Sequence, residues 1–142
     1  KVALLEQEFA ALLGCKYALA VSSCSAALFL SLKALDLPRD ARVLIPGFTF
    51  AAVPSSVIHA DCIPVLCEVG ENYRIDMADF EARLGDGIQA VIISHMRGHT
   101  SDMDAIMALC EERNIPVIED AAHSLGTTWH GANIGTLGVL AD

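Results

Sequence analysis

Short, nearly continuous apolar runs alternate along this chain with longer segments whose apolar residues recur at helical spacing. Runs at 42–45, 63–69, 89–94 and 116–119 predict strands buried on both faces, and residues 17–21 read as a further strand. Helices are expected at 2–13, 26–37, 52–60, 76–84 and 102–113, and a loop-rich hairpin at 126–138. This alternation predicts an α/β fold, a mostly parallel sheet with helices on both faces.

The apolar content, 54% of 142 residues, raises the question of a membrane span. The longest uncharged stretch, residues 43–60, has the length to cross a bilayer, but Pro46, Gly47 and Pro54 break it as a spanning helix. The first 13 residues carry two glutamates, which is unlike a signal peptide. We therefore expect a soluble protein.

The net charge and the cysteine content exclude some classes of function. A formal charge of −9 without a basic cluster disfavours nucleic-acid binding, so an anionic ligand must be held locally. Five cysteines, an odd count without a CxxC pair, argue against a disulfide framework and a zinc site. A reducing, cytoplasmic location is expected.

The two ends of the chain suggest a piece of something longer. The sequence starts inside a predicted helix without a methionine, and the apolar run at 139–141 predicts one more strand just before the last residue. We expect residues 1–142 to be one partial domain whose remainder follows in the parent protein.

Polar or aromatic residues follow three of the predicted strands, where ligands bind in open α/β sheets. Residues 22–25 (SSCS) precede a helix and could cradle a phosphate, although a plain serine N-cap is the alternative. Phe48 and Phe50 could stack on a flat ring, with core packing as the alternative.

The third strand end carries two adjacent carboxylates, Glu119 and Asp120. Strand alternation places them on opposite faces, so they should not form one acid–base pair. A carboxylate at a buried strand end requires a cation or a hydrogen-bond donor, and a protonated ring nitrogen would serve. A salt bridge or a helix N-cap is the alternative.

Two other kinds of site use residues nearby. A metal cluster would involve His95, His99, Asp102 and Asp104, but their spacing matches no ligand motif and Asp102 reads as an N-cap. A hydrolase triad of Asp120, His123 and Ser124 would require three neighbours on one turn to point at one another, without a nucleophile elbow. We expect neither, and no metal.

Taken together, these segments resemble the DegT/DnrJ/EryC1/StrS sugar aminotransferases, which are fold-type-I pyridoxal-phosphate-dependent enzymes. The similarity extends over the whole chain and rests on the order and spacing of motifs that are weak individually. These motifs are FAALLG at 9–14, VSSCSAAL at 21–28, PGFTF at 46–50, HMRG at 95–98, DMDAI at 102–106 and IEDAAH at 118–123.

The resemblance implies roles for five residues. Cys24 and Ser25 match the pair that holds the cofactor phosphate, although the family often has glycine-threonine there. Phe50 matches the aromatic that stacks on the pyridine ring, and Asp120 the aspartate that pairs with the ring N–H. His123 matches the glutamine or histidine beside the ring hydroxyl.

The resemblance also implies an activity for the parent protein and a Schiff-base lysine that this chain lacks. The parent would transfer an amine from an amino acid, glutamate or glutamine, to a keto sugar on a nucleotide carrier, as a homodimer. The only lysines are Lys1, Lys16 and Lys33, and none matches the family's Schiff-base lysine, so this chain alone should be inactive. The alternatives are a lysine-less sugar dehydratase with the same cofactor and a non-catalytic binding module.

Overall fold

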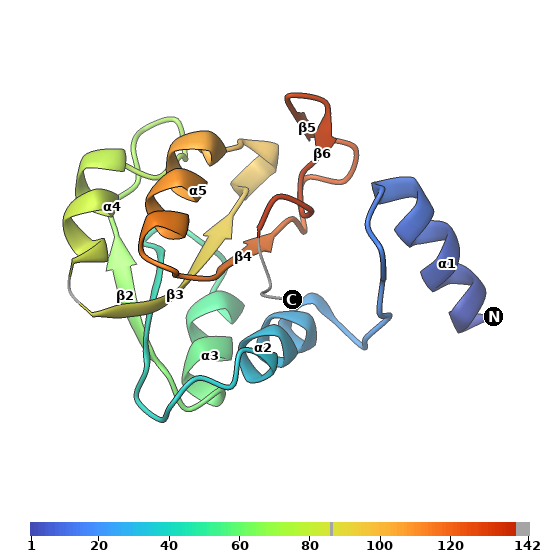
Figure 1. The fold of residues 1–142 in the computed structure, drawn as a ribbon, viewed down its shortest axis with the longest axis horizontal. Helices are drawn as coiled ribbons and strands as arrows, with labels where there is room; N and C mark the ends of the chain where they lie inside the picture. The colour runs from blue at the N-terminus through green and yellow to red at the C-terminus, as the bar shows by residue number, and fades with distance from the viewer. Residues whose placement is uncertain (86, 139–142) are drawn as a thin grey trace.

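A four-stranded parallel sheet organises the molecule (Figure 1). The computed structural model describes residues 1–85 and 87–138. The strands lie in the order β2-β1-β3-β4, and their bounds are β1 Arg42–Pro46, β2 Ile63–Cys67, β3 Ile88–Ser94 and β4 Val117–Asp120. The helices are α1 Val2–Leu13, α2 Cys24–Ala34, α3 Ala52–His59, α4 Met77–Leu84 and α5 Met103–Glu112. A small antiparallel hairpin pairs β5 (Thr128–Trp129) with β6 (Ala132–Asn133).

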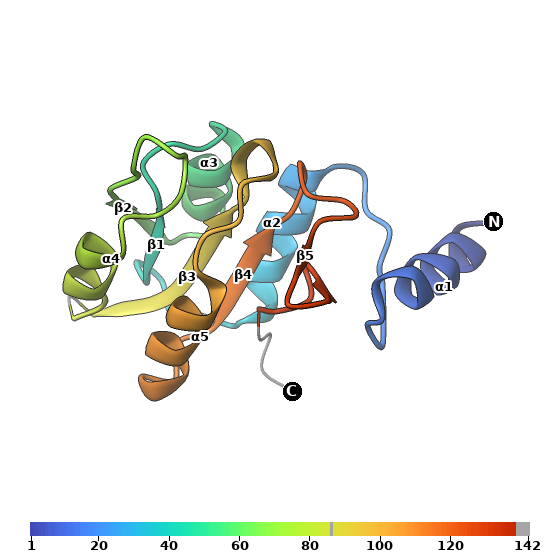
Figure 2. The same ribbon diagram turned by 90° about the horizontal axis from the view of Figure 1, so that it is seen from above.

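Helices cover both faces of the sheet, which confirms the predicted α/β class. Figure 2 shows α2 and α3 on one side and α4 and α5 on the other. Successive strand residues alternate between two cores, so Val43 and Ile45 join the α2/α3 side while Leu44 joins the α4/α5 side. The interior residues of β1 and β3 are buried on both faces and apolar, as the sequence pattern indicated, whereas the edge strand β2 leaves Ile63 and Leu66 exposed.

Local signals set several helix ends where they were expected. The Asp76 carboxylate accepts hydrogen bonds from the amides of Ala78 and Asp79 at the start of α4. Asp102 caps α5 in the same way. Gly14 ends α1 in the left-handed conformation, with φ of 78°, which glycine adopts at little cost.

Some predicted elements differ from those observed. Residues 17–21 are not a strand: they connect α1 and α2 without a strand partner within 1–85 and 87–138, and the amide of Ala20 donates to the Glu6 side chain instead. β2 ends at Cys67 rather than at residue 69, and Val69 makes only an isolated bridge with Ile75. α2 starts and ends earlier than the predicted 26–37. The strand expected at 139–141 lies outside the described residues.

α1 lies apart from the sheet and its covering helices in both views (Figures 1 and 2). Only Ala10 of this helix is buried, and Val2, Leu4, Leu5 and Leu12 are all more than half exposed. Among the described residues, every helix is too short or too polar to cross a bilayer.

The packing of α2 yields a matched pair of variants, because Leu32 is 1% exposed and Leu30, on the same helix, is 45% exposed. Leu32→Ala leaves a cavity against the sheet and should lower the free energy of unfolding by about 2–5 kcal/mol. Leu30→Ala should change it by only about 0.5 kcal/mol. Urea unfolding of the whole protein measures both, and equal losses would contradict the packing described.

Candidate active site

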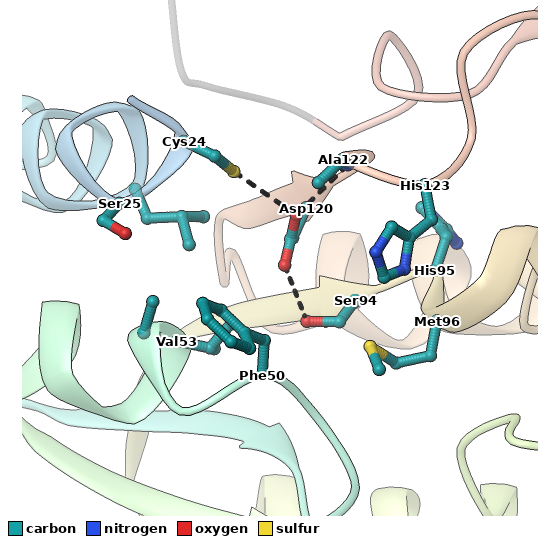
Figure 3. A pocket seen from close by; sticks show the side chains of 12 residues that line it. Cys24, Ser25, Phe50, Val53, Ser94, His95, Met96, Asp120, Ala122 and His123 are labelled. Atoms are coloured by element: carbon teal, nitrogen blue, oxygen red, sulfur yellow. Dashed lines mark hydrogen bonds between the residues drawn. The ribbon is translucent and has the colours of Figure 1, made fainter. Parts of the chain in front are cut away.

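A cavity of about 300 Å³ lies at the carboxyl ends of β1, β3 and β4, against the start of α2 (Figure 3). Segments far apart in the sequence meet there, as expected for a parallel sheet. All five residues singled out from the sequence line it: Cys24, Ser25, Phe50, Asp120 and His123. Leu28, Ala52, Val53, Ser94, His95, Met96 and Ala122 complete the lining.

The start of α2 forms one wall of the cavity. Ser23 is the N-cap: its Oγ lies 3.1 Å from the amide of Ala26, and its carbonyl accepts from Ala27 at 3.0 Å. The serine N-cap alternative is therefore correct for Ser23, whereas Ser25 lies on the cavity wall. The first amides of a helix have no intrahelical acceptor, so this wall suits an anionic group.

Asp120 ends β4 and lines the cavity beside the start of α2, where the described residues contact its carboxylate with neutral donors only (Figure 3). Its Oδ1 accepts from the amide of Ala122 at 3.2 Å and from the Cys24 thiol at 3.6 Å. Its Oδ2 accepts from the Ser94 hydroxyl at 3.2 Å. Within the described part of the chain no ion pair involves Asp120, and a turn rather than a helix follows β4. Among the described residues, neither a salt bridge nor a helix cap accounts for Asp120.

Partial burial and the neighbouring Asp120 carboxylate both favour the protonated form of the Cys24 thiol. Burial raises the pKa of the Cys24 thiol, and the charge of Asp120 and the hydrogen bond to it raise it further. A thiol that remains protonated acts as a weak donor to the carboxylate rather than as a nucleophile.

Glu119 points to the other side of the strand, as alternation predicted. Its carboxylate lies 3.2 Å from His95 Nε2 and accepts the amides of Gly135, Leu137 and Gly138 at 2.6–2.9 Å. Burial by itself raises the pKa of Glu119, but His95 and the three amides together outweigh it and lower this pKa. Glu119 thus holds residues 135–138 against β4, where a side chain at Gly138 would collide with the carbonyl of Val117.

The two ring-bearing residues approach the cavity from separate loops. Phe50 is 68% exposed and lines the cavity, so the core-packing alternative is wrong for it. His123 Nδ1 accepts the amide of Arg97 at 3.2 Å. In the neutral imidazole Nε2 then carries the proton and can donate to a ligand.

The residues of the two rival sites have separate partners. His95 binds Glu119, Asp102 caps α5, and Asp104 contacts Trp129 Nε1 and His130 Nε2, each at 2.9 Å. The described residues contain no group of three His, Cys, Asp or Glu suited to a metal ion. The Ser124 hydroxyl donates to the carbonyl of His95 and not to His123, so no triad forms.

Sequence reasoning missed Ser94 and did not assign His95 to this cavity. Ser94 is the polar residue that follows the apolar run 90–93 at the end of β3, which is the same signal that identified Asp120 on β4. That signal was available for Ser94. The pairing of His95 with Glu119 depends on how the strand ends meet, which no local pattern reveals.

Glu119→Gln tests the buried carboxylate. It should lower the free energy of unfolding at pH 7 by about 3 kcal/mol, because an amide cannot accept all four donors. The pKa of Glu119 is depressed in the folded protein, so the contribution is complete above its usual value of 4.5 and is lost as pH falls through the folded value. The gap between variant and wild type should therefore shrink below pH 4.5. Urea unfolding across pH measures it, with the exposed Glu112→Gln as the control.

Comparisons with known proteins identify relatives over nearly the whole chain. The spore coat polysaccharide biosynthesis protein SpsC of Bacillus subtilis is 40% identical over 97% of this chain and 36% of its own length. The GDP-perosamine synthase of Vibrio cholerae is 32% identical over 94% of this chain and 36% of its own length. The X-ray structure of an aminotransferase from Psychrobacter cryohalolentis superposes with a TM-score of 0.92 at 36% identity, covering 96% of this chain and 35% of that one.

The chain thus spans about a third of the length of the relatives it matches. The family model described as the DegT/DnrJ/EryC1/StrS aminotransferase family matches residues 1–141. That match covers nearly the whole chain and agrees with the motifs and with the parallel α/β fold. The chain belongs to the DegT/DnrJ/EryC1/StrS aminotransferase family.

Proposed function

We propose that residues 1–142 form the first part of the cofactor domain of a longer pyridoxal-phosphate-dependent aminotransferase. Its substrates would be a keto sugar, nucleotide-linked, and an amino acid donor such as glutamate or glutamine. Family membership supports the reaction class, and relatives about three times as long support a longer parent. The single observation that carries the proposal is the Asp120 carboxylate, which faces the cavity with neutral donors only.

The residues present fit this cofactor. The Asp120 carboxylate, which has no cation beside it among the described residues, is suited to a ring N–H, and the start of α2 is suited to a phosphate. A volume of about 300 Å³ is at the lower end of the range of small-molecule sites. Phe50 supplies an exposed aromatic face in the same cavity.

Bound pyridoxal phosphate would supply a protonated pyridine ring, which withdraws electrons from the attached substrate. The protein residues then have separate tasks. Asp120 would keep the proton on the ring nitrogen, while Ser25 and the amides of α2 hold the phosphate and so fix the ring. Phe50 would shield one side of the ring from water, and His123 Nε2 would donate to the ring hydroxyl oxygen.

The proton transfer on the substrate requires a further group. None of Lys1, Lys16 and Lys33 lines the cavity, and Lys33 is engaged with Asp61 at 3.6 Å. We propose that the Schiff-base lysine belongs to the remainder of the parent protein. The residues described here would bind and orient, and the missing lysine would move the proton.

Asp120→Asn tests the main assignment in the whole protein. An amide cannot hold a proton on the ring nitrogen as a carboxylate does, so the half-transamination rate should fall by orders of magnitude. Cofactor binding should survive in part, because the phosphate is held elsewhere. Stopped-flow absorbance and the melting temperature measure the two effects. Asp76→Asn, which preserves the cap of α4, is the control and should change neither. An active and only slightly less stable Asp120→Asn enzyme would refute the assignment.

The products separate this proposal from its alternatives. A keto sugar that gains an amine indicates the aminotransferase. Loss of a hydroxyl from the sugar, without a net amine transfer, would identify the lysine-less dehydratase instead. Cofactor binding with neither reaction would favour a non-catalytic module.

We also propose that the parent is a homodimer. Several leucines on α1 are exposed, among them Leu4 at 57%, and form an apolar surface. We expect a second copy of the parent protein to bury this surface. Sedimentation of the whole protein at micromolar concentration should show a dimer. Leu4→Glu should weaken it at least about tenfold, since each 1.4 kcal/mol changes the equilibrium constant by that factor. Gln7→Glu adds the same charge to the same helix at a polar position and is the control. A monomeric wild type would rule the proposal out.

A further inference from the structure

A buried hydroxyl lies beside the carboxylate of Asp120. Ser94 ends β3, is 5% exposed, and is the register partner of Asp120 on the neighbouring parallel strand. Equivalent positions on adjacent strands project to the same face, so the two side chains meet at 3.2 Å. On its other side, the Ser94 hydroxyl contacts Thr49 Oγ1, from the loop after β1, at 2.8 Å.

The charge of Asp120 fixes the direction of both hydrogen bonds. An ionised carboxylate can only accept, so the single proton of the Ser94 hydroxyl must point to Oδ2. Ser94 then has no proton left for Thr49, and the Thr49 hydroxyl must donate to Ser94. The three residues form one directed chain, from Thr49 to Ser94 to Asp120, across the ends of three strand segments.

Ser94 is the only side chain or amide among the described residues that donates to Oδ2 of Asp120. Oδ1 is held differently, by the Ala122 amide and the Cys24 thiol. A carboxylate offers about four acceptor positions, and these three donors leave one for a ligand. Removing the Ser94 hydroxyl would free one oxygen and allow the carboxylate to rotate.

We propose that Ser94, itself held by Thr49, is a positioning residue that orients the Asp120 carboxylate toward the nitrogen of the cofactor ring. The inference rests on the proposed function, since Asp120 must face that nitrogen for its orientation to matter. Figure 3 shows Ser94 and Cys24 holding Asp120 from two sides of the cavity. Ser94 itself touches no reacting atom in this proposal; it acts through Asp120.

The test uses the whole protein reconstituted with pyridoxal phosphate labelled with nitrogen-15 in the ring. Nitrogen-15 NMR reports the pH at which the ring nitrogen loses its proton, and thermal melting is recorded beside it. Ser94→Ala should lower this pH by about one unit or less, the size expected for a neutral hydrogen bond. Ser94→Thr keeps the hydroxyl and should restore the wild-type value.

Thr49→Val removes the far hydroxyl without changing the shape of the side chain. Alone it should produce a smaller downward shift than Ser94→Ala. Added to Ser94→Ala it should have no further effect, because the chain is already broken at Ser94. Ser101→Ala removes another buried hydroxyl, one that does not line the cavity, and should leave the ring titration unchanged.

Several outcomes would overturn the inference. An upward shift in Ser94→Ala would mean that Ser94 only withdraws charge from Asp120, and no shift would leave it a structural residue. Equal effects of Thr49→Val in both backgrounds would disprove the chain. Asp120→Asn separates failure of the proposed function from failure of the positioning role. If Asp120→Asn leaves the titration of the ring nitrogen unchanged, the proposed function fails. If Asp120→Asn changes this titration strongly while Ser94→Ala has no effect, only the positioning role of Ser94 fails.

Discussion

Burial of the sheet on both faces is the constraint on which the rest of this structure depends. The interior residues of β1 and β3 must each be apolar, since Val43, Ile45 and Ile92 enter one core while Leu44 and Val91 enter the other. A polar side chain can be accommodated only where a strand leaves the sheet. Because all four strands are parallel, the ends that carry Ser94 and Asp120 meet at one edge.

The same alternation separates two adjacent carboxylates into different tasks. The Glu119 carboxylate is hydrogen-bonded to His95 and to three backbone amides of residues 135–138, so it holds that segment to β4. Asp120 receives weaker, neutral donors and retains an acceptor position toward the cavity. Neighbours in sequence therefore differ in environment because a strand sends them to opposite sides.

The cavity exists only in the complete tertiary structure. Cys24 and Asp120 are 96 residues apart and yet share a hydrogen bond. The loop after β1 supplies both Thr49, which joins the hydrogen-bond chain, and Phe50, which lines the cavity. Loops fixed by a rigid sheet can present side chains that local structure could not hold together.

Much of the fold could be predicted from the sequence, because the period of apolar residues depends directly on secondary structure. The helix starts at Asp76 and Asp102 and the stop at Gly14 were also readable, since capping is local. Residues 17–21 show the limit of this reasoning. Their apolar pattern resembles a strand, but a strand also requires a hydrogen-bonding partner, and the residues that the structure describes supply none.

For the candidate site, the sequence by itself identified Asp120 at the end of a strand and Phe50 just after one, but it missed Ser94 at the end of β3. Phe50, Asp120 and His123 reach the cavity from the carboxyl ends of parallel strands, which share an edge, whereas Cys24 and Ser25 reach it from the start of α2. Only the tertiary structure decided what each of them contacts. The register of β3 against β4 places Ser94 beside Asp120, and the path of residues 135–138 gives Glu119 its donors. Such contacts depend on strand order and loop path, which are set by packing over the whole domain rather than by neighbouring residues.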